Sequence, residues 1–163
     1  MTLRKGDWVP DIDLVHMGAS GPEPISRDAL FGGRNVVVFA VPGAFTPTCS
    51  AQHLPSFLEC HDRIVAQGID QVACVSVNDV FVMHAWGQAK DPDGRVLMLA
   101  DGIGQWTRAA GLDWDLSSLG LGVRSQRYAM IVRDAVVRFI AVEQGGAFEA
   151  SSGQAILAAL QAQ

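Results

Sequence analysis

Cysteines and long apolar runs are both scarce in this sequence. Only three of the 163 residues are cysteine, which does not suit the disulfide framework of a small secreted protein. Apolar runs such as residues 36–41 are too short to cross a bilayer, and residues 1–14 hold no apolar stretch of signal-peptide length. We therefore expect a protein that makes no membrane contact and works in a reducing compartment, the cytoplasm.

Positive charge is sparse as well. Twelve Lys and Arg residues stand against seventeen Asp and Glu residues, which gives a formal net charge of −5, and the basic residues are scattered along the chain. Such a balance disfavours nucleic acid and anionic membranes as partners. The length suits a single domain over residues 1–163, and 49% hydrophobic residues suffice for a packed core.

Turn residues divide the chain into strands and helices. The patterns predict strands at 11–15, 36–41, 69–77, 96–99, 128–132 and 136–142, and helices at 46–67, 78–89, 104–110 and 151–162. Asn78 is expected to cap the second helix; residues 17–24 should form a hairpin-like turn and residues 112–122 a loop. This alternation predicts an α/β fold with a mixed central sheet flanked by helices, the layout of a thioredoxin-like fold.

The first long helix begins on the segment PGAFTPTCS, residues 42–50. Thr46 is expected to cap this helix, Pro47 to be its first residue and Cys49 to lie in its first turn. Free backbone N–H groups and the positive end of the helix dipole favour a thiolate there. Pro55 should kink the helix or loosen its first segment. Cys49 is therefore our hypothetical catalytic nucleophile.

A cysteine without help has a pKa near 8.5 and is only a few per cent ionised at neutral pH. A helix start favours ionisation by about one pKa unit, and a nearby arginine by about one to three more. Arg127 begins the strand expected at 128–132, which can lie beside the central strand. We therefore expect Arg127 to reach the turn that holds Cys49.

Five segments together resemble the peroxiredoxins, and within that family the type II or peroxiredoxin-5 branch. They are PGAFTPTCS (42–50), HLPSF (53–57), VACVSVND (72–79), AWG (85–87) and RSQRYAMIV (124–132). The similarity runs in order over nearly the whole chain, and its Pro-x-x-x-Thr-x-x-Cys element is highly specific. It implies a thiol peroxidase that reduces hydrogen peroxide and small alkyl hydroperoxides and needs no metal or organic cofactor.

The resemblance implies four catalytic residues. Cys49 matches the peroxidatic cysteine, which attacks the peroxide and becomes a sulfenic acid, and Thr46 matches the threonine that hydrogen-bonds thiolate and peroxide. Pro42 matches the proline that shields the site from water. Arg127 matches the arginine that stabilises the thiolate and the charge on the leaving oxygen. In that role the Thr46 hydroxyl would face the thiol and leave capping to other groups.

Two polar residues near the expected site keep open roles. Arg124 either supports Arg127 or faces solvent. Gln52 follows Cys49 by about one helical turn, and it either joins the polar network or is a solvated helix residue.

Apolar residues near the site have open roles too. Phe45, Leu119 and Leu121 either line the peroxide entrance or pack in the ordinary way. Loops that flank the active site commonly build a dimer interface in this family. We therefore expect a homodimer, with Phe45 and Trp86 as exposed contacts.

The remaining cysteines bear on how a sulfenic acid would be recycled. Cys74 is the alternative resolving cysteine, as in some plant-type relatives, and would imply thioredoxin as reductant. A disulfide needs Cα atoms within about 7 Å, which a mid-strand cysteine would not reach without local unfolding. Another branch carries its resolving cysteine in the loop before the last helix, where this chain has Ala150. We therefore expect a one-cysteine cycle, recycled by glutaredoxin or glutathione.

The sequence also leaves room for other functions. His53 lies one helical turn from Cys49, the spacing of two metal ligands or of a base for cysteine-dependent acyl transfer. Two ligands make no tetrahedral site, and no His-Asn or His-Asp signature is visible. A redox-inactive thioredoxin-like binding module is the alternative of another class, although Pro42, Thr46 and Arg127 beside Cys49 weigh against it.

The first long helix carries one more cysteine. Its apolar face is expected to consist of Leu54, Phe57, Leu58, Ile64 and Val65. Cys60 is expected to lie off this face as a passive residue, and His61 to pack on it.

Overall fold

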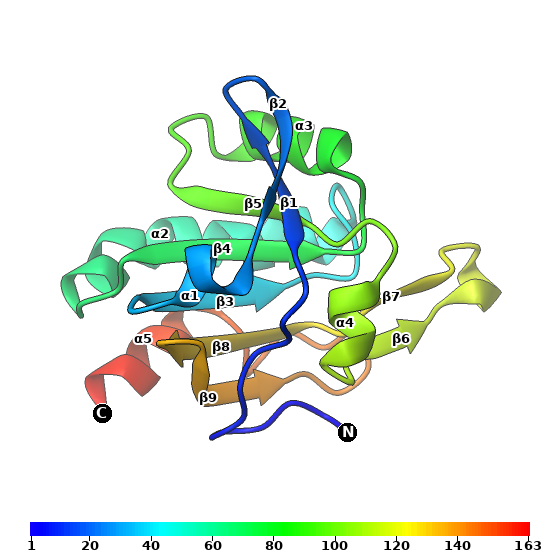
Figure 1. Ribbon diagram of the computed structural model, residues 1–163. Helices are drawn as coiled ribbons and strands as arrows, with labels where there is room; N and C mark the ends of the chain where they lie inside the picture. Colours follow the sequence, from blue (N-terminus) through cyan, green and yellow to red (C-terminus); the bar gives the residue numbers. More distant parts are fainter.

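The computed structural model describes residues 1–163 and places seven strands in one mixed sheet (Figure 1). The strands are β1 (Leu14–Gly18), β2 (Gly21–Ile25), β3 (Asn35–Ala40), β4 (Gln71–Ser76), β5 (Val96–Ala100), β8 (Tyr128–Arg133) and β9 (Val136–Val142). Their order is β2-β1-β5-β4-β3-β8-β9. Strands β3, β4 and β5 are parallel, and β8 pairs antiparallel with both β3 and β9. The predicted thioredoxin-like α/β fold is confirmed.

Helices cover both faces of the sheet (Figure 1). They are α1 (Arg27–Phe31), α2 (Leu54–Ala66), α3 (Val80–Lys90), α4 (Gln105–Ala109) and α5 (Gly153–Gln161), with a π-helical turn at Cys49–His53 and a 3₁₀ turn at Ser117–Leu119. Helices α2, α3 and α5 pack on one face, and α1, α4 and the N-terminal segment on the other. None of these helices combines the length and the apolar character needed to cross a membrane.

Strand β3 lies between two cores because its side chains alternate. Val37 and Phe39 face the core under α2, α3 and α5, whereas Val36 and Val38 face the core under α1 and α4. All four are buried. A strand that is covered on both faces has a continuous apolar run in its sequence. The run at residues 36–41 therefore located β3 correctly.

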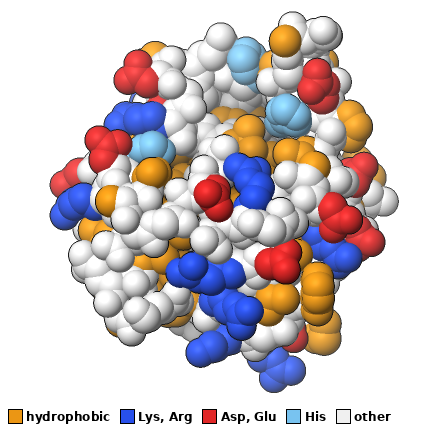
Figure 2. Space-filling view, turned by 60° about the vertical axis from the view of Figure 1, so that its left-hand side comes forward, with side chains coloured by type: hydrophobic (Ala, Val, Ile, Leu, Met, Phe, Trp, Pro, Cys, Tyr) orange, Lys and Arg blue, Asp and Glu red, His pale blue; other side chains and the backbone are white.

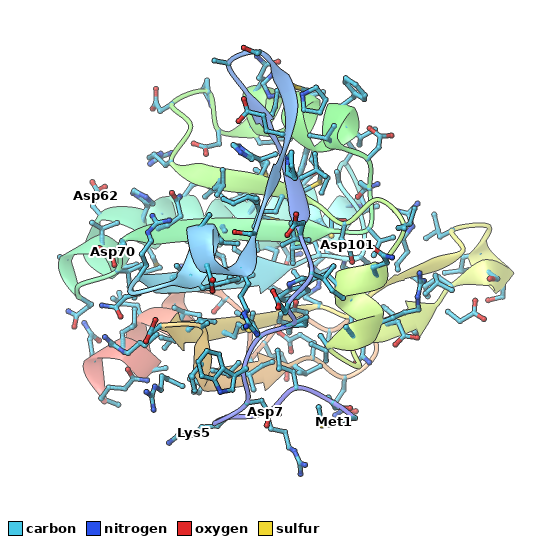
Figure 3. All side chains as sticks on the ribbon, in the orientation of Figure 1. Met1, Lys5, Asp7, Asp62, Asp70 and Asp101 are labelled. Carbon is cyan, nitrogen blue, oxygen red and sulfur yellow. The ribbon has the colours of Figure 1, made fainter.

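Two aspartates fix the ends of these elements, and both are labelled in Figure 3. Asp70 accepts a hydrogen bond from the Asn35 N–H at 2.8 Å, at the start of β3. Asp101 is buried and accepts from the N–H groups of Trp106 (3.2 Å) and Thr107 (2.8 Å), which are otherwise free at the start of α4. Side-chain carboxylates thus anchor backbone groups at the ends of a strand and a helix.

Charges of both signs cover the visible surface. Figure 2 shows acidic and basic side chains interspersed over one face, with the basic ones denser toward the lower rim. Arg4, Lys5 and Arg138 line one groove together with Phe139 and Ile140 of β9.

The region from residue 112 to residue 122 was wrongly predicted to be a loop. It contains β6 (Asp113–Asp115), which pairs antiparallel with β7 (Val123–Ser125) in a small separate sheet. The hairpin projects from one end of the molecule (Figure 1). Strands this short carry too little alternation to be detected from sequence.

Two finer predictions need correction, and a third is confirmed. Asp79, not Asn78, caps α3, and it accepts a hydrogen bond from the Val82 N–H at 2.9 Å. The strand expected at residues 11–15, as an edge strand, is β1 at Leu14–Gly18, and it is internal because β2 forms the edge. The hairpin-like turn expected at residues 17–24 is confirmed, because β1 and β2 pair as a hairpin there.

The buried face of α2 is rotated from the predicted one. Cys60 is completely buried, whereas Val65 is 42% exposed. Helix α5 packs along α2 from the Ser56 side, where the Gly153 N–H donates to Ser56 Oγ at 2.9 Å, and so widens the buried face toward Cys60. His61 is partly buried, with 16% of its side chain exposed.

Candidate active site

Cys49 lies in the first turn of a helix that begins at Pro47. Its side chain is completely buried. Residues 49–53 form a π-helical turn in which the Leu54 N–H donates to the Cys49 carbonyl. Pro55 has no N–H to donate to the carbonyl four residues earlier, and the wider turn before it is the loosened segment that the sequence predicted.

The turn that leads into this helix is held from two sides. Thr46 Oγ1 donates to the Gly43 carbonyl at 2.6 Å, so the prediction that the Thr46 side chain caps the helix is wrong. The Ala44 N–H donates to Asn78 Oδ1 at 3.0 Å. Phe45 adopts a left-handed backbone with φ of 65°, a strained conformation that is concentrated at functional sites.

Arg127 reaches this turn from the start of β8. Its guanidinium is buried, with 4% of the residue exposed. Nη2 donates to Cys49 Sγ at 3.4 Å and Nη1 donates to His53 Nδ1 at 2.9 Å. The Nε atom is buried without a partner. The structure thus brings Arg127 and Cys49 together, as the sequence predicted, and leaves the Nε–H of the guanidinium without a partner.

His53 is fixed in one tautomer by its two partners. A guanidinium can only donate, so Nδ1 accepts from Arg127 and Nε2 carries the proton that it donates to the Ser151 carbonyl at 2.9 Å. The ring contacts Phe39, Phe57 and Phe148, with centroid distances of 4.9, 5.6 and 5.2 Å. Burial, and then the Arg127 charge, lower the pKa of His53 to about 3.

This arrangement excludes the acyl-transfer alternative for His53. Both ring nitrogens are engaged, one by Arg127 and one by Ser151, so neither is placed to take a proton from Cys49. The neutral ring instead holds the guanidinium in position against the sulfur.

Glu143, the residue that follows β9, holds the loop that carries Ser151. Its carboxylate accepts from the N–H groups of Glu149 (2.8 Å), Ala150 (2.9 and 3.2 Å) and Ser151 (2.9 Å), and from Ser151 Oγ at 2.6 Å. Burial on its own would raise the pKa of Glu143, but the Ser151 hydroxyl and these N–H groups together lower it. The Glu143 N–H also donates to the Arg127 carbonyl at 2.9 Å.

A continuous chain of contacts therefore runs from Glu143 to Cys49. It passes from the Glu143 carboxylate to Ser151, from the Ser151 carbonyl to His53, and from His53 through Arg127 to the sulfur. The sequence analysis missed Glu143, Ser151 and the positioning role of His53. No local pattern marks them, because the contacts join residues far apart in the chain.

Arg124 does not touch Arg127. Its Nη1 donates to the Pro42 carbonyl at 3.5 Å and its Nε to the Leu121 carbonyl at 2.8 Å, so it links the Pro42 turn to the segment before β7. Gln52 is exposed and makes no hydrogen bond, which supports its interpretation as a solvated helix residue.

The predicted entrance residues lie at the surface. Phe45 is 53% exposed, Leu119 70% and Leu121 38%; their place at a peroxide entrance remains a prediction. Trp86 was wrongly expected to be exposed. It lies in α3 and is completely buried, and its indole N–H donates to the Oγ of Ser50, the residue after Cys49, at 2.9 Å.

Cys74 lies in β4, opposite Phe39 of β3, and is completely buried. Burial, with the nearby Cys49 as a second cause, raises the pKa of the Cys74 thiol well above its usual value. Cys60 is buried as well, and Arg63 Nη2 donates to its sulfur at 3.6 Å. No three His, Cys, Asp or Glu side chains gather so as to hold a metal ion.

Comparison with known proteins identifies relatives over almost the whole chain. Residues 4–157 match the Redoxin family model. The chain is 48% identical to the chloroplastic peroxiredoxin-2E-2 of Oryza sativa subsp. japonica over 164 residues, which cover 98% of this chain and 73% of that protein.

Solved structures agree with this similarity. The reduced Prx3 of Vibrio vulnificus, in complex with hydrogen peroxide, superposes with a TM-score of 0.93 at 46% identity, over 98% of this chain and 99% of that one. Peroxiredoxin 5 of Alvinella pompejana superposes with a TM-score of 0.88 at 37% identity, over 99% of both chains.

Proposed function

Because the chain belongs to the peroxiredoxins and is a thiol peroxidase, we propose that it reduces hydrogen peroxide and small alkyl hydroperoxides through a sulfenic acid on Cys49. The contact between Arg127 Nη2 and the buried Cys49 sulfur carries this proposal. A cation at 3.4 Å from a thiol in a first helical turn favours the thiolate, which is the attacking species. The V. vulnificus relative, solved with hydrogen peroxide, supports the substrate.

Each group around Cys49 has a separate role in the reaction with the peroxide. The thiolate attacks one peroxide oxygen, the O–O bond breaks, and its electron pair leaves with the second oxygen, which takes a proton to form water or an alcohol. Arg127 Nε, which has no partner in the protein, is the donor available to the peroxide oxygens. The Thr46 hydroxyl donates its proton in a hydrogen bond to the Gly43 carbonyl. Its oxygen Oγ1 therefore serves as acceptor for the peroxide O–H.

Peroxide titration tests this assignment. One equivalent of hydrogen peroxide added to the reduced protein should convert Cys49 selectively into a sulfenic acid, detected by mass spectrometry after trapping. Cys60 and Cys74 should remain reduced. If Cys49 reacts no faster than a free thiol at the same pH, the proposed function is wrong.

Recycling is proposed to follow a one-cysteine cycle with glutathione or glutaredoxin. The first thiol attacks the sulfenic sulfur, releasing water and leaving a mixed disulfide, and a second thiol releases the reduced enzyme. Ala150 provides no sulfur in the loop before α5, and the raised pKa of Cys74 keeps its attacking thiolate scarce.

Comparing the two donor systems tests the cycle. Glutathione with glutaredoxin should support turnover, and thioredoxin with its reductase should support it poorly. Faster turnover with thioredoxin would favour the alternative in which Cys74 resolves the sulfenic acid.

We also propose a homodimer that works in the cytoplasm. Phe45, in the active-site turn, and Leu119, in the turn of the β6–β7 hairpin, are both exposed, and exposed apolar side chains of this kind are typical of interfaces. Sedimentation of Phe45→Ser should show a shift toward monomer relative to the wild type, and fractionation of cells should place the protein in the soluble fraction.

A further inference from the structure

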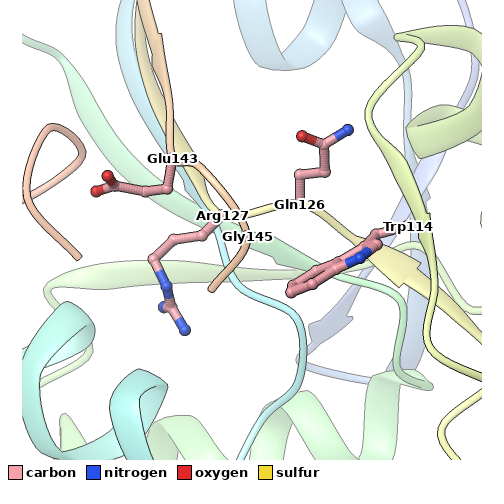
Figure 4. A pocket seen from close by; sticks show the side chains of 5 residues that line it. All are labelled: Trp114, Gln126, Arg127, Glu143 and Gly145. Atoms are coloured by element: carbon pink, nitrogen blue, oxygen red, sulfur yellow. The ribbon is translucent and has the colours of Figure 1, made fainter. Parts of the chain in front are cut away.

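A cavity of about 340 Å³ is lined by residues of β1, α3 and β5 and of the turn that follows α3. Met17 of β1, His84 of α3 and Met98 of β5 are among them, and we call this cavity the methionine pocket. It shares no lining residue with the pocket between Arg127 and Trp114 that Figure 4 shows. Two thioethers and an imidazole therefore line one cavity outside the active site.

The two methionines lie opposite each other on neighbouring strands. Strands β1 and β5 pair antiparallel with Val15 opposite Ala100. Two residues further along, the same register places Met17 opposite Met98. Side chains in this relation share one face of the sheet, with Cβ atoms about 4.5–5.5 Å apart. The pairing of the strands thus brings the two sulfur-bearing side chains together.

Helix α3 brings the imidazole to the same place, because it packs against both strands. Gly87 follows His84 by about one turn and lies on the same face of the helix. A Cβ atom on Gly87 would lie 2.9 Å from Met98 Cγ and 4.0 Å from Met98 Sδ. The glycine therefore lets Met98 lie directly against α3, with its sulfur in reach of the His84 ring.

The charge on the pocket wall is already balanced. Asp91 is the one carboxylate that lines the pocket. Its Oδ2 accepts a hydrogen bond from the Val96 N–H at 2.8 Å, and its Oδ1 lies 3.5 Å from Arg95 Nε. The pocket thus offers neutral donors to a cation. Thioether sulfur favours the soft ion Cu(I), whereas Mg²⁺, Ca²⁺ and Mn²⁺ prefer oxygen ligands.

We propose that Met17, Met98 and His84 form a binding site for Cu(I), with two thioether sulfurs and one imidazole nitrogen as ligands. All three side chains are partly exposed, so an ion can reach them, whereas Met83 of α3 is completely buried and does not line the pocket. The site goes beyond the peroxidase function and uses no group of the active site.

Anaerobic titration with Cu(I) against a coloured Cu(I) chelator measures the affinity. Cys49→Ser protein is the background, because a thiolate is itself a metal ligand. In this background the double variant Met17→Leu/Met98→Leu keeps the apolar volume and removes both sulfurs. It should bind Cu(I) at least ~100-fold more weakly, because even a residue that only hydrogen-bonds a metal ligand is worth ~10–100-fold in affinity. Met83→Leu is the matched control and should bind as before.

A second pair of variants tests the imidazole in the same way. His84→Gln should weaken binding of Cu(I). His16→Gln is its control, because His16 is the neighbour of Met17 on β1 but lies 3.7 Å from Glu23 of β2, and it should leave the affinity unchanged.

NMR of protein labelled with ¹³C at the methionine methyl groups identifies the ligands without any substitution in the pocket. One equivalent of Ag(I), a redox-inert substitute for Cu(I), should shift the signals of Met17 and Met98 and leave those of the other three methionines in place. Unchanged affinity in the double variant would overturn the proposal. If that variant does not fold, Ag(I) that shifts neither the Met17 nor the Met98 signal overturns it instead.

Discussion

Cys49 and Cys74 are both completely buried in the core under α2, α3 and α5, yet their surroundings differ. Cys74 lies in a strand among apolar neighbours, where burial raises the pKa of its thiol well above the usual value. Cys49 lies at a helix start with the Arg127 guanidinium 3.4 Å from its sulfur. The two sulfurs thus differ in their partners: Cys74 has none, whereas Cys49 has a fixed cation that can stabilise the negative charge developing in the reaction.

Replacing each cysteine in turn is the strongest test of this contrast. Cys49→Ser should abolish peroxide consumption supported by glutathione and glutaredoxin, because no other thiol in the chain has a cationic partner at a helix start. Cys74→Ser should retain turnover within about twofold, since a buried thiol with a raised pKa supplies little thiolate. Loss of turnover in a folded Cys74→Ser protein would instead make Cys74 the resolving cysteine.

Removing the Arg127 guanidinium should make Cys49 react slowly with peroxide, as Cys74 is expected to do. Arg127→Gln should lower the second-order rate constant with hydrogen peroxide about 100-fold, the usual cost of losing a preorganised donor to developing charge. Stopped-flow oxidation of Cys49 measures it. Arg124→Gln is the matched control: the Arg124 side chain donates hydrogen bonds to the carbonyls of Pro42 and Leu121 and none to Cys49, so a much smaller loss is expected. Equal losses in both variants would mean that general charge, not the contact, matters.

Replacing Glu143, which supports Arg127 through Ser151 and His53, should have a smaller effect than replacing Arg127 itself. Glu143→Gln weakens the hydrogen bonds to the Ser151 hydroxyl and three N–H groups, and should lower the free energy of unfolding by about 1.5–3 kcal/mol at pH 7. The folded pKa of Glu143 lies below its usual value of 4.5, so this stabilisation is present above pH 4.5 and is lost as the pH falls through the folded value.

Urea unfolding of wild type and Glu143→Gln at pH 7 and near pH 3 checks both points. Glu149→Gln serves as control, because Glu149 is exposed and contributes only its backbone N–H to this cluster. A difference between Glu143→Gln and wild type that stays constant across this pH range would contradict the assignment.

His53 adds an effect on stability at acid pH, whereas Cys74, with its raised pKa, can have such an effect only at alkaline pH. The folded pKa of His53 is about 3, below the usual 6.5, so the unfolded chain binds a proton first as the pH falls. The wild type should therefore lose up to about 1.4 kcal/mol of stability per pH unit below pH 6.5, and His53→Gln should lack this part of the slope. His61→Gln is the control; identical slopes in wild type and His53→Gln would show that His53 is protonated in the fold.

Much of this contrast could be read from the sequence, and the reasons are local. The apolar run that became β3 and the Thr-Pro-Thr-Cys helix start carry their signals in neighbouring residues. Arg127 was paired with Cys49 because it opens a strand that can lie beside β3. These features depend on short-range chemistry and on one rule of sheet topology.

The features that the sequence did not predict depend on tertiary contacts. Trp86 was placed at the surface because nothing near it indicates that α3 packs its indole toward Ser50. The chain from Glu143 through Ser151 to His53 joins three elements. The β6–β7 hairpin, which carries Trp114, has strands too short for their alternation to be distinguished from a loop.

The carboxylate of Glu143 also limits how this enzyme can be redesigned. A cysteine introduced at Ala150 would lie on a segment whose backbone N–H groups, at residues 149, 150 and 151, donate to Glu143, so the backbone that carries its sulfur would be restrained. Engineering an intramolecular disulfide cycle therefore takes two substitutions, Ala150→Cys to supply the sulfur and Glu143→Gln to release the backbone. The second substitution weakens the contacts that position Arg127. The double variant would therefore recycle without an external thiol at the first step, but its Cys49 would attack peroxide more slowly.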